Sequence, residues 1–211
     1  MRVQEDAAGW AGRAIGRRLR DAVRDRGWGT LAVSGGTTAP PMLAALAAMD
    51  VPWDVIDIWQ VDERVAPDGD PDRNANQLAG VPGRHHLMPV TAADLRAAAA
   101  AYSYTLPERF DVVHLGMGAD GHTASWPPGD PVIASTEPVD LSREYQGRVR
   151  MTLTPPVVDA ARSRVVLIMG ADKAAAVAAW LERVTTPDKL PIARVRRSGT
   201  VVVLDPAAAP T

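Results

Sequence analysis

Hydrophobic positions recur along the chain with two different spacings. From residue 4 to residue 26, apolar side chains return every three or four positions, which predicts an amphipathic helix. Short apolar runs bounded by glycine, proline or charged residues predict buried strands. The predicted strands span 30–34, 55–61, 110–115, 148–153, 164–169 and 201–204, and further helices are predicted at 40–49, at 94–102, from 155 and at 172–184.

These helices and strands alternate from end to end, which favours an α/β fold around a mostly parallel sheet. A segment rich in Pro, Asp, Gly and Asn predicts a loop at 66–74, and prolines keep residues 126–147 irregular. Because no internal repeat or long linker divides the chain, we expect one domain over residues 1–211, with a frayed tail at 206–211.

Composition narrows the class of protein. Apolar residues make up 46% of the 211 residues, which is enough to bury a substantial core. The net charge of -2 provides no positive field, so we expect neither nucleic acid nor a membrane as a partner. The absence of cysteine excludes disulfides, thiolate metal sites and a thiol nucleophile. With no signal-peptide pattern and no apolar run of membrane-spanning length, we expect a cytoplasmic monomer or small homo-oligomer.

Polar segments directly follow three of the predicted strands. They read SGGTT after the first strand, DER after the second and GMGADGH after the third. Ligands of open parallel sheets bind beyond the carboxyl ends of the strands, where such segments converge. The sequence therefore predicts a binding site formed by these three segments.

The SGGTT segment (34–38) has the properties of an anion-binding loop. Gly35 and Gly36 let the backbone approach a ligand closely, and the following helix start offers unpaired N–H groups. Thr37 and Thr38 add hydroxyl donors. The lysine and spacing of a P-loop are missing, so a single phosphate fits better than a nucleoside triphosphate. A tight strand-to-helix turn that needs glycine is the alternative.

The run GMGADG (116–121) matches the G-x-G-x-x-G pattern of dinucleotide sites and follows a strand. That fingerprint needs a helix to begin at this point. Pro127, Pro128 and Gly129 leave no room for such a helix. We therefore expect no dinucleotide cofactor.

His122 is the candidate general base, because an imidazole in a strand-end loop titrates near neutrality and Asp120 is close enough in sequence to orient it. The alternative is a histidine that only makes hydrogen bonds within the loop. His114 lies inside a predicted strand and is expected to be structural. His85 and His86 are expected to be surface residues of a loop.

Three basic side chains are candidates for binding an anionic substrate. Arg64 is suited to a substrate oxygen that becomes negative, Arg150 lies on a predicted strand, and Lys173 lies in the first turn of a predicted helix, where it opposes the helix dipole. Asp62 and Glu63 either hold Arg64 or bind a metal ion, although no histidine stands at ligand spacing and no metal is expected. No G-x-S-x-G nucleophile is present, so water is the expected nucleophile of a hydrolase.

Taken together, these segments resemble the 6-phosphogluconolactonase family and its sugar-phosphate isomerase and deaminase relatives. SGGTT is similar to the family's SGGST phosphate loop, and VDERVAPDGDPDRN is similar to its DER segment and the DPxSN stretch, matching at Asn74. FDVVHLGMGADGHTAS is similar to FDLVLLGMGPDGHTAS, which is the most specific of these motifs. RMTLTPPVVDAAR resembles RITLTLPVLNAAR, and GADKAAAV resembles a GxxK helix start.

The resemblance implies a three-layer α/β/α fold with a Rossmann-like sheet, and hydrolysis of 6-phospho-D-glucono-1,5-lactone to 6-phosphogluconate in the oxidative pentose phosphate pathway, without cofactor or metal. By the same resemblance, Gly35, Gly36 and Thr37 cradle the phosphate with help from Arg150 and Lys173.

For the chemistry, the resemblance assigns activation of water to His122, orientation of that histidine to Asp120, and stabilisation of the oxyanion to Arg64. This agrees with the needs of a cyclic ester, which are a base, an oriented water and charge stabilisation.

The chain also departs from the family pattern. Thr37 replaces a serine and Ala39 a proline, and SWPPG replaces SLFPG, so Trp126 and Pro127 are expected to reshape the pocket wall. These changes, together with the short chain, affect substrate preference more than reaction class.

Two other functions remain open on the same fold. Amino-sugar phosphate deaminases and isomerases carry a glutamate a few residues after the histidine, where this chain has Pro127. A non-catalytic sugar-phosphate sensor needs the phosphate loop but not His122 and Arg64, and usually comes with a DNA-binding module, for which this sequence supplies no helix-turn-helix.

Overall fold

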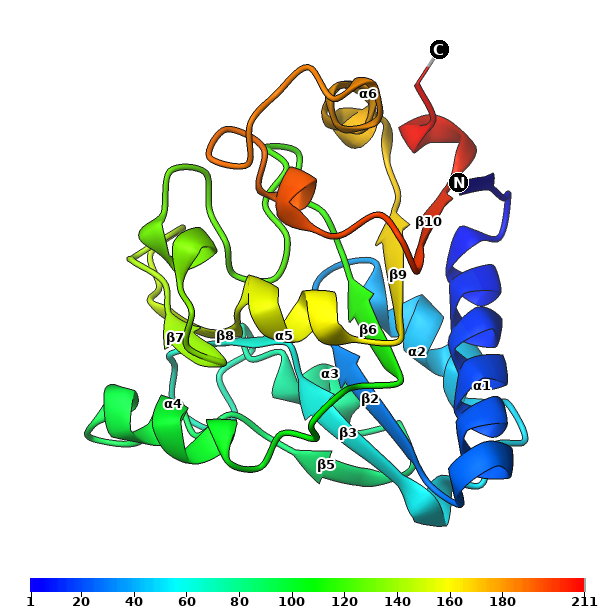
Figure 1. Ribbon diagram of the computed structural model, residues 1–211, viewed down its shortest axis with the longest axis vertical. Helices are drawn as coiled ribbons and strands as arrows, with labels where there is room; N and C mark the ends of the chain where they lie inside the picture. Colours follow the sequence, from blue (N-terminus) through cyan, green and yellow to red (C-terminus); the bar gives the residue numbers. More distant parts are fainter. Residues whose placement is uncertain (211) are drawn as a thin grey trace.

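The computed structural model describes residues 1–210 and is built around a seven-stranded sheet in which all paired strands are parallel (Figure 1). The order across the sheet is β1-β10-β9-β6-β2-β3-β5. The strands, in that order, are Arg2–Val3, Thr200–Leu204, Ser163–Ile168, Val112–Leu115, Gly29–Val33, Ile56–Gln60 and Arg84–His86.

Helices cover both faces of this sheet, which gives the expected three-layer α/β/α arrangement (Figure 1). The long helix α1 packs with α2 and α3 on one face, and their apolar side chains share a core cluster with strands β2 and β3. Helices α4, α5 and α6 pack on the other face. The helices are α1 (Ala7–Arg26), α2 (Ala39–Ala47), α3 (Ala75–Leu78), α4 (Leu95–Ser103), α5 (Pro155–Ala160) and α6 (Ala174–Glu182).

Local sequence explains where the first helix begins and ends. The Asp6 carboxylate accepts a hydrogen bond from the Gly9 amide and caps the N-terminus of α1. Gly27 ends the helix in a left-handed conformation (φ 85°), which glycine adopts without a steric penalty. The helix predicted at 4–26 is therefore confirmed, with its first turn starting at Ala7.

A second, antiparallel sheet lies beside the first and was not predicted. Its order is β4-β8-β7, with β4 at Asp62–Arg64, β8 at Arg150–Leu153 and β7 at Val139–Leu141. The DER segment is thus a strand, and Arg64 pairs in register with Arg150. Three-residue strands bounded by polar residues have no sequence signature, because only the partner strand stabilises them.

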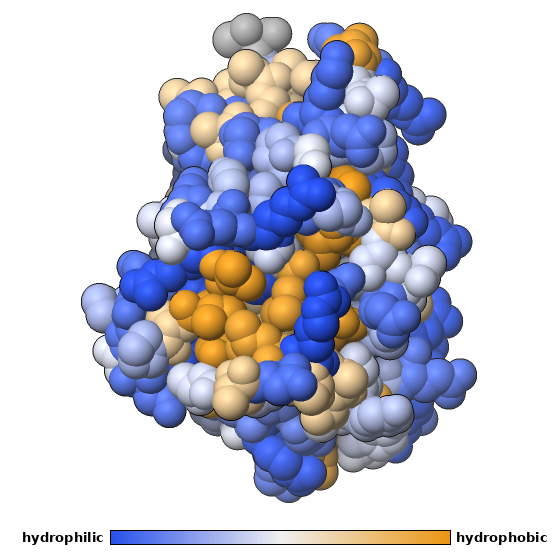
Figure 2. Space-filling model, turned by 90° about the vertical axis from the view of Figure 1, so that its left-hand side faces the viewer, coloured by the Kyte–Doolittle hydropathy of each residue, from blue (hydrophilic) through white to orange (hydrophobic). Residues whose placement is uncertain are grey.

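The small sheet lies on the left in Figure 1, and Figure 2 shows that side of the molecule, where apolar side chains gather in a hollow among polar ones. On this side, η2 (Pro131–Ala134), β7 and α4 surround a pocket of about 460 Å³ that includes Val132, Leu141, Arg96 and Arg143. This pocket is separate from the site described below.

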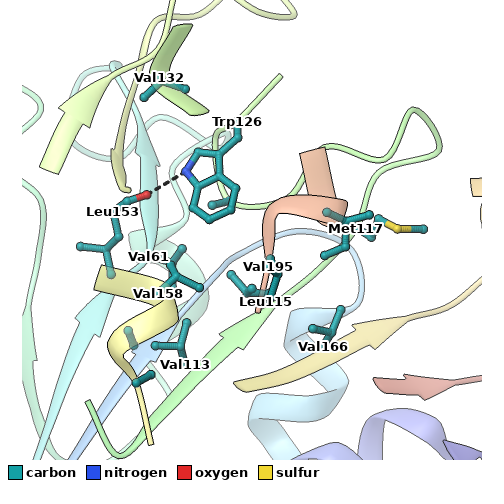
Figure 3. Packing of buried hydrophobic residues seen from close by; sticks show 14 of the residues in the cluster. Val61, Val113, Leu115, Met117, Trp126, Val132, Leu153, Val158, Val166 and Val195 are labelled. Atoms are coloured by element: carbon teal, nitrogen blue, oxygen red, sulfur yellow. Dashed lines mark hydrogen bonds between the residues drawn. The ribbon is translucent and has the colours of Figure 1, made fainter. Parts of the chain in front are cut away.

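Trp126 corrects the expectation drawn from the SWPPG segment. Its side chain is fully buried and packs among apolar residues of the sheet and of α5 (Figure 3). The indole Nε1 donates to the Leu153 carbonyl at 2.9 Å, which joins the segment to β8. Trp126 therefore belongs to the core, and its predecessors Thr123 and Ala124 face the candidate site instead.

The loop expected at His85 and His86 was another wrong prediction. His85 and His86 lie on strand β5, where the His86 ring stacks on Trp59 with centroids 4.1 Å apart and bonds Asp57. Strand β5 forms one edge of the sheet, and β1 forms the other.

The frayed tail is also not seen within the described residues. Pro206–Ala208 form a short 3-10 helix, which Asp205 caps by accepting from the Ala208 amide at 2.8 Å, and Ala208 is fully buried. Thr211 lies outside the described residues. Within residues 1–210, no helix has the length and hydropathy needed to span a membrane.

Candidate active site

The candidate site is a pocket of about 230 Å³ at the carboxyl ends of the sheet strands. It lies where the strand order diverges, because the chain runs from β2 to β3 and β5 on one side and from β6 to β9 and β10 on the other. Such a switch point is where open α/β sheets bind ligands. All predicted site residues except Asp120 line the pocket, namely Gly35, Gly36, Thr37, Thr38, Arg64, His122, Arg150 and Lys173.

Residues in and next to α3 contact the loop between β2 and α2 and fix its conformation. A Cβ atom on Gly35 would lie 2.2 Å from Asn74 Oδ1, so only glycine allows this close approach. Gly36 has φ 113°, a conformation that favours glycine, and its amide donates to Gln77 Oε1 at 3.1 Å. The Gly36 amide is therefore already used inside the protein, which the sequence did not predict.

His122 and Asp120, the candidate base and the residue proposed to orient it, form a hydrogen-bonded pair. Nδ1 of His122 lies 2.6 Å from Asp120 Oδ1, and the same carboxylate oxygen accepts from the His122 amide at 3.1 Å. An ionised carboxylate only accepts hydrogen bonds, so Nδ1 carries the proton and Nε2 of the neutral ring keeps its lone pair. Since His122 lines the pocket, this arrangement suits a general base.

Tyr145 binds to this pair, and it was not identified from the sequence as a site residue. Its hydroxyl donates to Asp120 Oδ2 at 2.6 Å, and its ring meets the His122 ring edge-to-face with centroids 5.3 Å apart. Burial acts to raise the pKa of Asp120, but the hydrogen bonds from Tyr145 and His122 outweigh it and lower that pKa. Burial, together with the Asp120 carboxylate, raises the pKa of Tyr145 to about 12, so the phenol stays protonated.

The three predicted cations meet at the pocket from three separate elements. Arg150 on β8 is almost completely buried, and burial lowers its pKa although Asp62 opposes the shift. Arg64 on β4 donates to the Asp72 carbonyl. Lys173 is the N-cap residue of α6 rather than part of its first turn, and it pairs with Asp172.

Asp62 and Glu63 do not hold the Arg64 guanidinium, which corrects one of the two predicted roles. Burial raises the pKa of Asp62, and its Oδ2 accepts from the Ser125 hydroxyl at 2.7 Å. Glu63 is fully buried and accepts from backbone amides of the loop that leads into α3. Within residues 1–210, no group of three or more His, Cys, Asp or Glu side chains is placed to hold a metal ion.

The structure also agrees with two local predictions, for the segment after GMGADG and for His114. No helix begins among the described residues 116–130, because the chain after His122 turns back at a bridge between Thr123 and Trp126. His114 is fully buried in β6, where burial lowers its pKa to about 4. It is therefore a neutral core residue.

Comparison with known proteins agrees with this geometry. Residues 3–203 match the family described as glucosamine-6-phosphate isomerases/6-phosphogluconolactonase. A 6-phosphogluconolactonase of Streptomyces coelicolor is 36% identical, with 91% of this chain and 85% of the relative covered. One of Synechocystis sp. is 32% identical, with 89% and 85% covered.

The fold is shared with solved structures as well. The crystal structure of 6-phosphogluconolactonase from Thermotoga maritima has a TM-score of 0.85 to this chain at 23% identity, with 96% of this chain and 97% of that one covered. On the match over residues 3–203 and these identities, the chain belongs to the glucosamine-6-phosphate isomerase/6-phosphogluconolactonase family.

Proposed function

We propose that this protein hydrolyses 6-phospho-D-glucono-1,5-lactone to 6-phospho-D-gluconate, a step of the oxidative pentose phosphate pathway. The observation that carries the proposal is that His122, which Asp120 holds, lines one pocket together with a glycine-rich loop and three basic side chains. The relatives named 6-phosphogluconolactonase support the same reaction.

His122 activates water in the proposed reaction. Its Nε2 accepts a proton from a water molecule as the water oxygen attacks the lactone carbonyl carbon C1. Asp120 holds the ring through Nδ1 and stabilises the imidazolium that forms. The tetrahedral oxyanion at C1 then collapses, the bond from C1 to the ring oxygen breaks, and the imidazolium returns its proton to that oxygen.

Arg64 stabilises the oxyanion in this proposal. Its position on β4 is fixed by pairing with β8, so a positive charge is present before charge develops on the substrate. The reaction requires no redox cofactor, because no oxidation state changes between lactone and acid.

In this proposal the phosphate binds at the glycine-rich loop, where Gly35, Thr37 and Thr38 offer amides and hydroxyls at the start of α2. Arg150 and Lys173 supply the positive charge. Since Gly36 donates to Gln77, we assign it a conformational role rather than a phosphate contact.

The test is the hydrolysis of freshly generated 6-phosphogluconolactone, followed with coupled 6-phosphogluconate dehydrogenase and corrected for spontaneous opening. We expect clear acceleration that is weaker on unphosphorylated gluconolactone. No acceleration would overturn the proposal. If the protein instead released ammonia from glucosamine 6-phosphate, its function would be deamination.

A further inference from the structure

A hydrogen-bonded chain of side chains runs from His122 across the pocket to Arg150. Beyond Asp120 and Tyr145, Gln146 Nε2 donates to the Tyr145 hydroxyl at 3.2 Å, and Gln146 Oε1 accepts from Arg150 Nη2 at 3.1 Å. The Arg150 guanidinium also lies over the Tyr145 ring, 5.1 Å from its centroid. One tyrosine and one glutamine therefore connect the base to a cation of the proposed phosphate site.

The tip of the β7–β8 hairpin presents these two residues. Tyr145 and Arg148 exchange backbone hydrogen bonds of 2.9 and 3.3 Å, which closes a two-residue turn at Gln146 and Gly147. Both turn residues have positive φ, 52° and 77°, as a type I′ turn requires. Arg148 fastens the hairpin to Asp70 at 3.0 Å. Glutamine is a strained residue at such a position, and residues in this state cluster at functional sites.

We propose that Tyr145 is a positioning residue of the lactonase site, which fixes Asp120 and thereby the His122 ring, and that Gln146 ties this assembly to Arg150. The inference rests on the proposed function and adds two residues to its machinery.

The geometry explains why the tyrosine matters. Asp120 binds His122 through Oδ1 and Tyr145 through Oδ2, so the carboxylate is held at both oxygens and cannot rotate. The Asp120 side chain is 38% exposed even with Tyr145 in place, and without the phenol it would retain only its hydrogen bonds to His122. The base then keeps its identity but loses its fixed orientation, which general-base catalysis requires.

The phenol also changes how readily the dyad takes up a proton. A carboxylate that has lost the hydrogen bond from Tyr145 interacts more strongly with a proton on the adjacent imidazole, so the Asp120–His122 dyad takes up that proton more readily. The midpoint of that protonation therefore rises. Three cations face the pocket, Arg150 from β8, Arg64 from β4 and Lys173 from α6. They disfavour protonation of the dyad equally in the wild type and in the variant, so their effect cancels in the comparison.

The experiment compares Tyr145→Phe with the wild type and with Tyr104→Phe, a control at an exposed tyrosine. Phenylalanine keeps the ring against His122 and Arg150 and removes only the hydroxyl. We expect kcat to fall about tenfold with KM nearly unchanged, and the acid limb of kcat/KM to move up by about one pH unit, as the loss of one hydrogen bond to a charged group implies.

Nitrogen-15 NMR of the His122 ring, assigned with His122→Ala, measures the same midpoint without substrate. An unchanged midpoint and pH profile in Tyr145→Phe would overturn the inference. If the midpoint rises while the wild type fails to hydrolyse the lactone, the positioning role stands and the proposed function falls.

Gln146→Gly tests the second half of the inference. Glycine accepts the positive φ, so the turn is kept while both side-chain hydrogen bonds are lost. We expect KM for the phosphorylated lactone to rise severalfold with little change for unphosphorylated gluconolactone. Equal effects on the two substrates would remove Gln146 from the phosphate end.

Discussion

At the scale of the residue, His122 is held through Nδ1 and faces the pocket with the rest of its ring. Because it is the proposed base, His122→Ala is expected to lower kcat by about 10²–10⁴-fold. The ring is only partly buried and is not part of a core cluster, so the melting temperature should change little. Near-normal turnover with a correct melting temperature would remove His122 as the base.

Gly118 controls the position of the same ring. A Cβ atom there would lie 2.1 Å from His122 Cε1 and Nδ1 and 2.7 Å from Asp120 Oδ1, so Gly118→Ala must displace the pair. We expect most lactonase activity to be lost while the circular dichroism spectrum is unchanged. Gly80→Ala is the matched control, because a Cβ there meets nothing within 4 Å. Full activity of Gly118→Ala would contradict the described geometry.

Lys173 is expected to act on the phosphate alone. Lys173→Ala should raise KM for the phosphorylated lactone far more than for unphosphorylated gluconolactone, because the lost ammonium neutralises a group that only the former carries. The control is Lys189→Ala, since Lys189 is exposed and does not line the pocket. Equal KM changes for both substrates would refute this role.

At the scale of the element, Glu63 on β4 joins the small sheet to the loop that leads into α3. It is fully buried, its Oε1 accepts from the Asn74 amide at 2.8 Å, and its Oε2 lies 3.0 Å from Nε of the buried Arg73. Glu63→Ala removes the buried partner of that Nε, while Nη1 of Arg73 keeps Asp68 and the Ala66 carbonyl, and is expected to cost about 1–3 kcal/mol in the free energy of unfolding.

Urea unfolding of Glu63→Ala and Glu63→Gln measures this loss. The amide keeps one acceptor oxygen for the loop amides, so we expect a smaller loss in Glu63→Gln. If both variants unfold at the wild-type urea concentration, β4 does not depend on this carboxylate.

At the scale of the whole molecule, buried His114 makes the stability depend on pH. Its folded pKa of about 4 lies below the ordinary value of 6.5, so the unfolded chain binds the proton more readily. Above pH 6.5 the imidazole is neutral in both the folded and the unfolded chain, so its burial does not lower the stability. As the pH falls from 6.5 to 4, only the unfolded chain takes up the proton, and stability is lost. The total loss is about 3 kcal/mol.

His114→Leu removes this titration. We expect urea unfolding between pH 7.5 and pH 4 to show a smaller loss of stability in the variant than in the wild type. Parallel losses in the two proteins would mean that His114 is not buried as a neutral residue.

Short-range sequence patterns predicted the main sheet well. Strands β2, β6 and β9 contain apolar runs because both faces of a parallel sheet are covered by helices, so the run itself marks burial. Strands β1, β4, β5 and β7 have two or three residues each, and no periodicity can be read from so few positions.

The candidate site divides in the same way. Gly35, Arg64 and His122 belong to the segments that follow predicted strands, so their convergence was expected from parallel topology. Tyr145 and Gln146 lie in a stretch that is predicted to be irregular because of its prolines. Gln146 reaches the pocket, and Tyr145 reaches Asp120, only because the β7–β8 hairpin places them there.

The sequence by itself determined the fold class and the convergence of the SGGTT, DER and GMGADGH segments, because these depend on local apolar patterns and on the shared edge where parallel strands end. Only the tertiary structure decided that Trp126 packs in the core, that Glu63 binds the loop that leads into α3, and that the Tyr145 hydroxyl donates to Asp120. Those contacts join segments far apart in the chain, and their distances are set by packing and by antiparallel pairing of short strands, which leave no local pattern.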